Sequence, residues 1–316
     1  MRFVPADEIR SLLNFPMLIS ALEAAHRRPK IEVQDALFGS ETAQYLVRNA
    51  VDRGRYMASK LITSFPANVD RGGLPAVQAV CVLFDGTNGR PLAVIDGTEI
   101  TYWRTAADSA LGAKILAPPD PATLLMVGAG AMSTRLVHAH RAVRPSLRRV
   151  LVWNRTRERA QQVAARLTDE GIESEPCDDL AAATRIADIV STCTRSHEAL
   201  VLGANLKPGA HLDLVGGYTP STREADDEAA RRALIFVDRR ESAFGGVGDI
   251  SQPIASGAIR PADVLGDLYD LVSGAVAGRR SPSDITFFKN AGGAHLDLMT
   301  AELIVQRLSG EGGLTE

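Results

Sequence analysis

The stretch Thr123–Ser133, TLLMVGAGAMS, decides the fold of this chain. A short apolar run with the composition of a buried strand leads directly into Gly-Ala-Gly-Ala-Met-Ser, and a helical pattern then continues to about Val143. Glycine allows a tight turn and a close approach of the backbone to a pyrophosphate, and amides at a helix N-terminus favour an anion. The order of strand, glycine turn and helix therefore predicts a dinucleotide site. The turn residues expected to contact the dinucleotide are Gly128, Gly130, Ala131 and Met132.

The neighbouring sequence supports this interpretation, although the motif by itself is imperfect. Ser133 stands at the third fingerprint position, where glycine or alanine is usual. A second apolar run, RRVLVWN, ends at Asn154, at about the spacing expected for the next parallel strand. A glycine turn that binds nothing is the weaker alternative, because both flanking elements fit a dinucleotide-binding unit.

The end of the second strand indicates which dinucleotide is bound. An acid at this place accepts hydrogen bonds from the ribose hydroxyls of NAD and repels a ribose phosphate. This chain has Asn154, Arg155 and Thr156 there, followed by Arg157. Guanidinium, amide and hydroxyl groups are suited to bind a phosphate, so we expect NADP(H), with Asn154, Arg155 and Thr156 as contacts. Solvated helix charges are the alternative interpretation of Arg157 and Arg159.

The chain beyond the proline cluster APPDP has a βαβ pattern. Apolar runs such as ADIVSTCT, GAHLDLVG, ALIFVD and DITFFKN alternate with helical segments. Unbroken apolar runs are typical of parallel strands that are buried on both faces. Thr192 and Thr194 follow one of these strands, where they would either face a cofactor at the carboxyl edge of the sheet or act as capping hydroxyls.

The residues before the proline cluster have a different character. From Gln44 to Asp96 short β-rich runs predict an antiparallel sheet, and Lys60 interrupts one of them, YMASKLITSF. Arg104 lies in TYWRTAADSALGAKIL, a helix that we expect to begin with Thr101 as N-cap, so that the arginine falls in the first turn, where an anion is favoured. Lys60 and Arg104 suit a small carboxylate. The alternative is an edge-strand lysine and a surface arginine paired with a nearby acid.

Composition excludes several classes of protein. The chain of 316 residues can bury a substantial core as one large domain or two ordinary ones. Its three cysteines lie far apart, which argues against a disulfide framework or a zinc site, and the scattered histidines offer no metal site, so we expect none. A net charge of −3 gives no pull toward nucleic acid or an anionic membrane, and no stretch is long and apolar enough to span one. We expect a cytoplasmic protein.

Several segments resemble the ornithine cyclodeaminase and mu-crystallin family, in the same order over nearly the whole chain. They include YMASKLITSF, WRTAADSALGAKIL, VGAGA, WNRT, GGYTPSTREADD and ITFFKNAGGAHLDL. The resemblance implies a Rossmann domain, expected at residues 118–296, inserted into an α+β substrate and dimerisation domain with an antiparallel sheet, expected at residues 1–117 and 297–316. It also implies a homodimer formed through the antiparallel domain.

The resemblance also implies roles for individual residues. The family's strand lysine and RTAA arginine, which hold the substrate carboxylate, fall on Lys60 and Arg104, and Arg48 is our candidate for a further substrate-binding cation. Ornithine cyclodeaminases have an aspartate after the two small residues of the GGYTP segment, where this chain has Tyr218. A phenol is a poor general base at neutral pH, which argues against cyclodeamination and against an alanine dehydrogenase.

The WNRT segment matches the NADPH-using mu-crystallin branch, whose members reduce ketimines. We therefore expect NADPH-dependent reduction of Δ1-pyrroline-2-carboxylate to proline, and also of Δ1-piperideine-2-carboxylate to pipecolate. In this scheme Lys60 and Arg104 hold the carboxylate, and Tyr218 lines the pocket or hydrogen-bonds the imine side. For His295 and Asp297 in GGAHLDL we favour packing over substrate contact.

Two alternatives to a ketimine reductase remain open. The first is an ornithine cyclodeaminase or amino-acid dehydrogenase whose proton-handling group comes from elsewhere in the fold. The second is a protein of a different class, which binds NADPH and a small ligand without turnover.

Overall fold

The computed structural model describes residues 1–40, 42–68 and 73–310. It divides into two compact units, Met1–Thr105 with Gly293–Glu316, and Ala106–Gly292. The division falls within one long helix, α3 (Gly97–Leu116), which contributes residues to both units. The predicted domain limits place this helix in the first domain, and they stay a prediction; residues 311–316 of that domain lie outside the described part.

The first unit is built on a six-stranded sheet with the strand order β1-β6-β5-β4-β3-β2. Strands β3 to β6 pair antiparallel, as the sequence predicted. Strand β2, which the sequence did not indicate, pairs antiparallel with β3, whereas β1 joins β6 in parallel and makes the sheet mixed. The strands are β1 (Arg2–Val4), β2 (Glu32–Ser40), β3 (Ala43–Asp52), β4 (Tyr56–Ser64), β5 (Val77–Asp85) and β6 (Pro91–Asp96). The remaining elements are α1 (Ala6–Leu12), α2 (Phe15–His26), a 3-10 turn η1 (Pro66–Asn68) and α11 (Ala294–Ser309).

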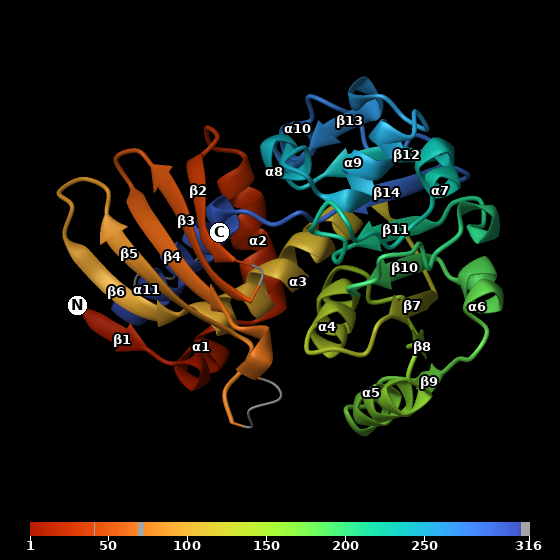
Figure 1. The fold of residues 1–316 in the computed structure, drawn as a ribbon, viewed down its shortest axis with the longest axis horizontal. Helices are drawn as coiled ribbons and strands as arrows, with labels where there is room; N and C mark the ends of the chain where they lie inside the picture. Colours follow the sequence, from red (N-terminus) through yellow and green to blue (C-terminus); the bar gives the residue numbers. More distant parts are fainter. Residues whose placement is uncertain (41, 69–72, 311–316) are drawn as a thin grey trace. The chain divides into compact units, whose positions relative to one another are not determined.

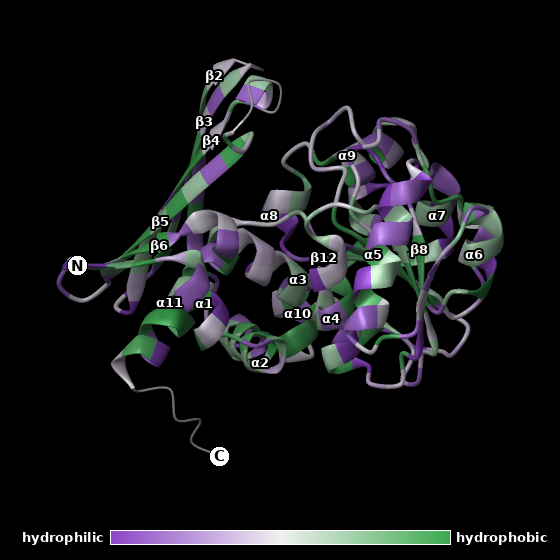
Figure 2. Cartoon of the chain, turned by 90° about the horizontal axis from the view of Figure 1, so that it is seen from below, coloured by the Kyte–Doolittle hydropathy of each residue, from purple (hydrophilic) through white to green (hydrophobic). Residues whose placement is uncertain are grey.

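Helix α11 packs on one face of this sheet, against β3 and β4, and also contacts α2 (Figure 1). Small and apolar side chains of the strands meet the helices there, and they are buried, as Ala58, Leu83 and Ile95 illustrate. Because side chains alternate along a strand, every second residue points to the other face, which these helices leave uncovered (Figure 2).

The second unit contains an eight-stranded parallel sheet with the order β13-β12-β14-β11-β10-β7-β8-β9. Its strands are β7 (Thr123–Val127), β8 (Arg149–Trp153), β9 (Ser174–Pro176), β10 (Ile189–Thr192), β11 (His211–Leu214), β12 (Ala233–Val237), β13 (Val264–Asp267) and β14 (Ile285–Lys289). The strand order around β7 reverses direction between β7 and β10, as in doubly wound folds, where ligands bind beyond the carboxyl ends of the strands.

Helices flank this sheet on both faces (Figure 1). They are α4 (Ser133–Val143), α5 (Arg157–Asp169), α6 (Leu180–Ile186), α7 (Asp227–Arg232), α8 (Arg240–Ala243), α9 (Gly248–Ala255) and α10 (Leu268–Ser273), with 3-10 turns η2 (Gly203–Asn205) and η3 (Pro261–Asp263). The strand core is continuous and apolar, with residues such as Leu125, Val190 and Phe287 almost fully buried. None of the described helices is long and apolar enough to cross a membrane.

Candidate functional site

A group of charged side chains lies on the helix-covered face of the six-stranded sheet. Lys60 is in the middle of β4, and Arg48 is directly opposite it on β3. Strand β4 is an interior strand, and Lys60 is only 1% exposed. The alternative of an edge-strand lysine is therefore wrong, because the ammonium group is buried where it needs a partner of opposite charge.

Helix α3 begins at Gly97, five residues earlier than the predicted N-cap Thr101 implies. Its first turn is capped by Asp96, whose Oδ1 accepts the amide proton of Glu99 at 2.8 Å. The prediction of Thr101 as N-cap is wrong, because strand β6 runs directly into the helix and aspartate at its end is the better cap. Arg104 consequently lies beyond the first turn, and the helix dipole contributes little to anion binding at this residue.

Asp297, in the first turn of α11, pairs with both predicted carboxylate-binding cations. Its Oδ1 accepts a hydrogen bond from Lys60 Nζ at 2.9 Å and lies 3.4 Å from Arg104 Nε. The Lys60 ammonium also donates to the Thr101 hydroxyl. The sequence favoured a packing role for Asp297, but these ion pairs place it among the charged groups, 237 residues away from Lys60 in the chain.

Burial and charge act in opposite directions on these groups. Burial would raise the pKa of Asp297, but Lys60, Arg104 and Arg48 hold that pKa below its usual value. Burial lowers the pKa of Lys60, and the Asp297 carboxylate partly offsets this effect. The mutual ion pair therefore favours an ionised Asp297 beside two cations.

Arg48 completes the cluster and has an acid of its own. Its Nε donates to Asp35 Oδ2 on β2 at 2.8 Å, at the more exposed side of the group. We call Asp35, Arg48, Lys60, Arg104 and Asp297 the charged cluster. Three cations against two carboxylates leave one positive charge when all five are ionised. The cluster thus suits a ligand with one uncompensated carboxylate.

The dinucleotide turn has the geometry that its sequence predicted. Gly128 has φ of 111°, and a Cβ atom there would lie 2.6 Å from the carbonyl oxygen of Cys193. At Gly130 a Cβ atom would meet nothing within 4 Å, so the space above this residue is open. Ser133 is buried, and its hydroxyl donates to the Gly130 carbonyl at 2.8 Å, so that serine at the third fingerprint position supports the turn.

Asn154 connects the glycine turn to the end of the second strand. Its Oδ1 accepts the amide proton of Ala129 at 3.2 Å, and its Nδ2 donates to the Thr156 carbonyl at 2.9 Å. The asparagine therefore fixes two segments that a bound dinucleotide would contact, while its own side chain is occupied within the protein.

The two neighbouring arginines differ in their surroundings. Arg157 pairs with Asp178. Arg155 is exposed, and within residues 1–40, 42–68 and 73–310 it forms no ion pair. Thr156 precedes α5 as N-cap residue, but its hydroxyl caps no amide. Arg155 and Thr156 are consequently the groups at this strand end that can bind an anion without breaking an existing contact.

The hydroxyls of Thr192 and Thr194 are already bonded to a buried acid that the sequence did not reveal. Glu224 accepts the Thr192 hydroxyl at 2.6 Å, the Thr194 amide at 2.6 Å and the Gly216 amide at 2.7 Å. Burial and the nearby Asp249 raise the pKa of Glu224 to about 7. A role of Thr192 and Thr194 in cofactor binding stays a prediction. In the structure, their contacts with Glu224, together with that of the Gly216 amide, hold the loops after β10 and β11 together.

Lys289, at the end of β14, neutralises part of this buried charge. Its Nζ donates to Asp249 Oδ2 at 2.9 Å and also to the Gly216 carbonyl. Lys289 is thus engaged in a buried salt bridge with Asp249. The partners could be found only from the fold, because Glu224 and Asp249 lie in polar segments that resemble solvent-exposed loops.

Tyr218 follows β11 in the segment that carries an aspartate in ornithine cyclodeaminases. Its side chain is 53% exposed, in contrast to the buried acids around it. Its hydroxyl forms no hydrogen bond with any residue that the structure describes. The phenol is therefore accessible to a ligand, and none of the described residues accepts its proton in a hydrogen bond.

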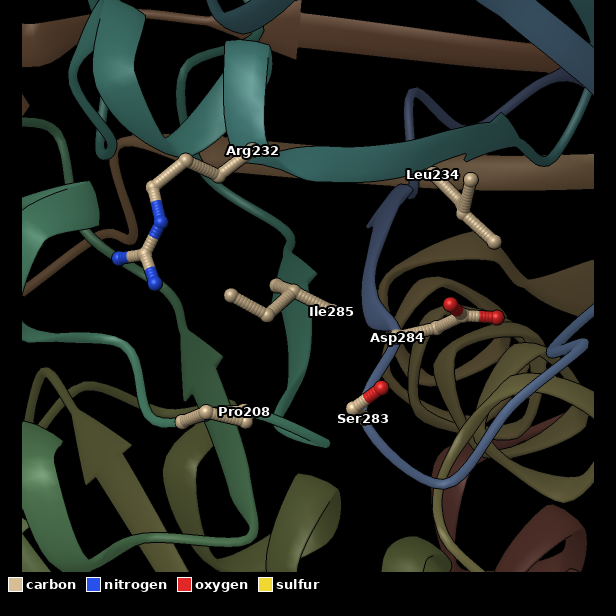
Figure 3. A pocket seen from close by; sticks show the side chains of 6 residues that line it. All are labelled: Pro208, Arg232, Leu234, Ser283, Asp284 and Ile285. Carbon is tan, nitrogen blue, oxygen red and sulfur yellow. The ribbon is translucent and has the colours of Figure 1, made fainter.

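A shallow depression of about 300 Å³ lies elsewhere on the second unit (Figure 3). It is lined by Pro208, Arg232, Leu234, Ser283, Asp284 and Ile285. Strands β12 and β14 begin at Ala233 and Ile285, so this depression lies at their amino ends. Because ligands of doubly wound folds bind at the carboxyl ends, it is not the candidate site.

Comparison with known proteins agrees with this architecture. The model of the ornithine cyclodeaminase/mu-crystallin family matches residues 16–312. The chain belongs to the ornithine cyclodeaminase/mu-crystallin family. This membership confirms the resemblance drawn from the sequence motifs, and it confirms the α/β fold with a Rossmann-type unit.

Members of the ornithine cyclodeaminase/mu-crystallin family with known structure or activity resemble this chain along its length. A Δ1-pyrroline-2-carboxylate reductase of Paracoccus denitrificans is 42% identical over 311 residues, 98% of each chain. The structure of Thermococcus litoralis Δ1-pyrroline-2-carboxylate reductase in complex with NADH and L-proline matches with a TM-score of 0.92 at 28% identity, covering 99% of this chain and 98% of that one. An archaeal alanine dehydrogenase dimer with bound NAD matches with a TM-score of 0.90 at 28% identity, covering 98% and 97%.

The two glycines of the turn give a prediction that separates folding from ligand binding. Gly128→Ala should lower the free energy of unfolding by roughly 1–3 kcal/mol, because φ is positive and the new Cβ meets the Cys193 carbonyl. Gly130→Ala should change it by less than about 0.5 kcal/mol, because the Cβ enters open space. Urea unfolding of both variants measures the difference. Equal destabilisation would contradict the geometry of the turn.

Proposed function

We propose that this protein is an NADPH-dependent ketimine reductase, which converts Δ1-pyrroline-2-carboxylate to L-proline and Δ1-piperideine-2-carboxylate to L-pipecolate. The observation that carries the proposal is the buried pair Lys60 and Arg104 in a cluster with one excess positive charge. Its similarity to the Paracoccus denitrificans reductase, and to the Thermococcus litoralis reductase solved with L-proline, supports the substrate class.

Lys60 and Arg104 would bind the substrate carboxylate, and Arg48 would contribute at the more exposed side. Two buried cations gain strength as carboxylate ligands, since the dielectric around them is low and water does not compete. The same contacts fix the orientation of the neighbouring C=N bond. Binding and orientation are the main contribution that a reductase of this kind must make.

Reduction of a ring ketimine needs no strong base. A hydride adds to the imine carbon, the electron pair of the C=N bond moves to nitrogen, and a protonated imine makes the carbon electrophilic. Cyclodeamination requires proton transfers during loss of ammonia as well. The exposed Tyr218 fits the simpler reaction, in which it lines the pocket or hydrogen-bonds the imine side.

NADPH is the proposed cofactor because of the strand end after β8. Arg155 and Thr156 offer an exposed guanidinium and a hydroxyl that caps no amide, and no acid stands there to repel a ribose phosphate. Gly128, Gly130, Ala131 and Met132 would contact the pyrophosphate, and Thr192 and Thr194 the nicotinamide side. The two structural relatives named above contain NADH and NAD, so the phosphate preference rests on this chain's own residues.

The proposed reaction predicts NADPH oxidation with both cyclic imines. L-ornithine with NAD⁺ should release no ammonia, and L-alanine with NAD⁺ should give no NADH. Absorbance of the reduced nicotinamide measures the oxidation of NADPH and the formation of NADH, and the release of ammonia needs a separate assay. Turnover of ornithine or alanine without imine reduction would favour the cyclodeaminase or amino-acid dehydrogenase, and binding of NADPH without any turnover would favour the non-catalytic role.

The arginine pair predicts where the cofactor preference resides. Arg155→Ala should weaken NADPH binding by roughly 10- to 100-fold, because a charge-assisted contact to phosphate is lost, and should leave NADH binding within about twofold. Arg157→Ala is the matched control, because Arg157 already pairs with Asp178. Titration calorimetry measures the affinities of the two variants for NADPH and for NADH. Equal loss of NADPH and NADH affinity in Arg155→Ala would refute the phosphate contact.

A homodimer formed through the six-stranded sheet is the proposed assembly. The alternation of side chains along the strands places Phe3, Phe38, Tyr45 and Val80, which are 37–60% exposed, on the face that the helices of this unit leave uncovered. An apolar face of this kind is typical of a subunit interface. The archaeal alanine dehydrogenase of similar fold is a dimer.

Charging this face should separate the subunits. A Phe38→Glu/Val80→Glu double variant places like charges in the proposed interface and should give the mass of one chain, whereas the wild type should give twice that mass. Light scattering coupled to size exclusion measures both. A wild-type mass of 33.8 kDa would contradict the proposal.

A further inference from the structure

Asp297 has one carboxylate oxygen that the ion pairs do not use. Oδ1 faces Lys60 and Arg104, whereas Oδ2 is buried and has no hydrogen-bond partner among the residues that the structure describes. The whole side chain is 1% exposed. A buried carboxylate oxygen without a donor is energetically costly, so a bound ligand that supplies a donor would be favoured.

The charges around Asp297 match those of a protonated α-imino acid. Such a molecule carries its carboxylate and its cationic nitrogen on one carbon atom, so that a site for it needs cations and an anion side by side. Asp297 Oδ1 lies 2.9 Å from Lys60 Nζ and 3.4 Å from Arg104 Nε, so that the carboxylate and the two cations are direct neighbours. Two buried cations for the carboxylate and one buried carboxylate for the nitrogen are therefore present together.

We propose that Asp297 is a substrate-binding catalytic residue, whose Oδ2 accepts a hydrogen bond from the protonated imine nitrogen while Lys60 and Arg104 hold the substrate carboxylate. The proposal rests on the proposed ketimine reductase function and adds the group that recognises the nitrogen. In this proposal the N–H proton of the amine product comes from the protonated imine itself, and Asp297 holds this N–H group in place.

The reaction balances without proton transfer from the protein. Hydride from the dihydronicotinamide forms a C–H bond at the imine carbon, and the dinucleotide is oxidised. The π electrons of the C=N⁺ bond become the lone pair of an amine nitrogen, which keeps its original N–H proton. The amine then takes a proton from water, giving the zwitterionic amino acid. Asp297 remains ionised and stabilises the cation at the start and the ammonium at the end.

The groups that face Asp297 favour this role. They are Lys60 on β4, Arg48 on β3, Arg104 on α3 and Cys81 on β5. The cations keep the pKa of Asp297 below its usual value, whereas burial, followed by Asp297, raises the pKa of the Cys81 thiol to about 12, so that this thiol stays neutral. Asp297 is thus an anion beside its cations, and its second oxygen can receive an N–H donor.

Ligand pairs that differ only at the nitrogen test the proposal. L-proline and cyclopentanecarboxylate share a five-membered ring and a carboxylate, but only proline has an N–H donor. Binding of each to the NADP⁺ form of the wild type and of Asp297→Asn is measured by calorimetry at pH 7.5. Effects of the substitution on Lys60 and Arg104 act on both ligands and cancel in the ratio of the two affinities.

We expect the wild type to prefer proline, and Asp297→Asn to reduce this preference by roughly 10- to 100-fold, as expected for loss of a charged hydrogen bond. Glu302→Gln is the matched control on the same helix, because Glu302 is a buried acid that pairs with Arg28 and Arg55 outside the charged cluster. This variant should keep the wild-type preference.

A second ligand pair is tested on the wild type alone, so that the test remains decisive if Asp297→Asn fails to fold. Pyrrole-2-carboxylate presents N–H where furan-2-carboxylate presents an oxygen lone pair, so the wild type should bind the pyrrole more tightly. Equal affinity for pyrrole and furan, or an unchanged proline preference in Asp297→Asn while the wild type still reduces cyclic imines, would overturn the role of Asp297 alone. A wild type that neither reduces the imines nor binds proline would instead overturn the ketimine reductase on which it rests.

Discussion

The burial of Lys60 in the middle of a sheet is the constraint on which the first unit depends. An ammonium group in this place is costly unless a carboxylate accompanies it, and the carboxylate comes from Asp297 on the last helix. The C-terminal segment therefore has to return to the sheet formed by the first hundred residues, as its packing on β3 and β4 shows. Arg104, on the helix that leaves this sheet, joins the same carboxylate.

The second unit meets a similar requirement in a different way. Parallel strands end together at one edge, and the loops that follow them need their amides satisfied. Glu224 accepts amide protons from two of these loops, and Lys289, which pairs with Asp249, neutralises part of the negative charge of the two acids. The glycine turn after β7 is held by Asn154 from the next strand. Buried polar groups thus shape the edge at which a dinucleotide would bind.

The sequence predicted the elements whose signal is local. The glycine turn, the apolar strands of the parallel sheet and the sheet of β3 to β6 followed from short-range patterns, and the ordered motifs identified the family. The strand Glu32–Ser40 was missed, because its charged and polar residues hide the alternation of an edge strand. The start of α3 was placed too late, because threonine is a plausible cap by residue type, whereas the Thr101 hydroxyl donates to the Gly97 carbonyl within the helix.

Contacts between distant residues could not be predicted from local patterns. Asp297 and Lys60 are separated by 237 residues, and nothing in GGAHLDL shows that its aspartate meets a buried lysine. Glu224 and Asp249 lie in segments whose composition is that of exposed loops, yet both are buried. Lys60 and Arg104 themselves were identified through the family resemblance, since spacing alone left an ordinary surface pair as likely an explanation.

The most direct test of the charged cluster is a crystal structure of the protein with L-proline and NADP⁺. We expect the proline carboxylate to bond to Lys60 and Arg104, and the proline nitrogen to lie within hydrogen-bond distance, about 2.7–3.2 Å, of Asp297 Oδ2. Proline bound with its nitrogen away from Asp297, or at another place in the first unit, would contradict it.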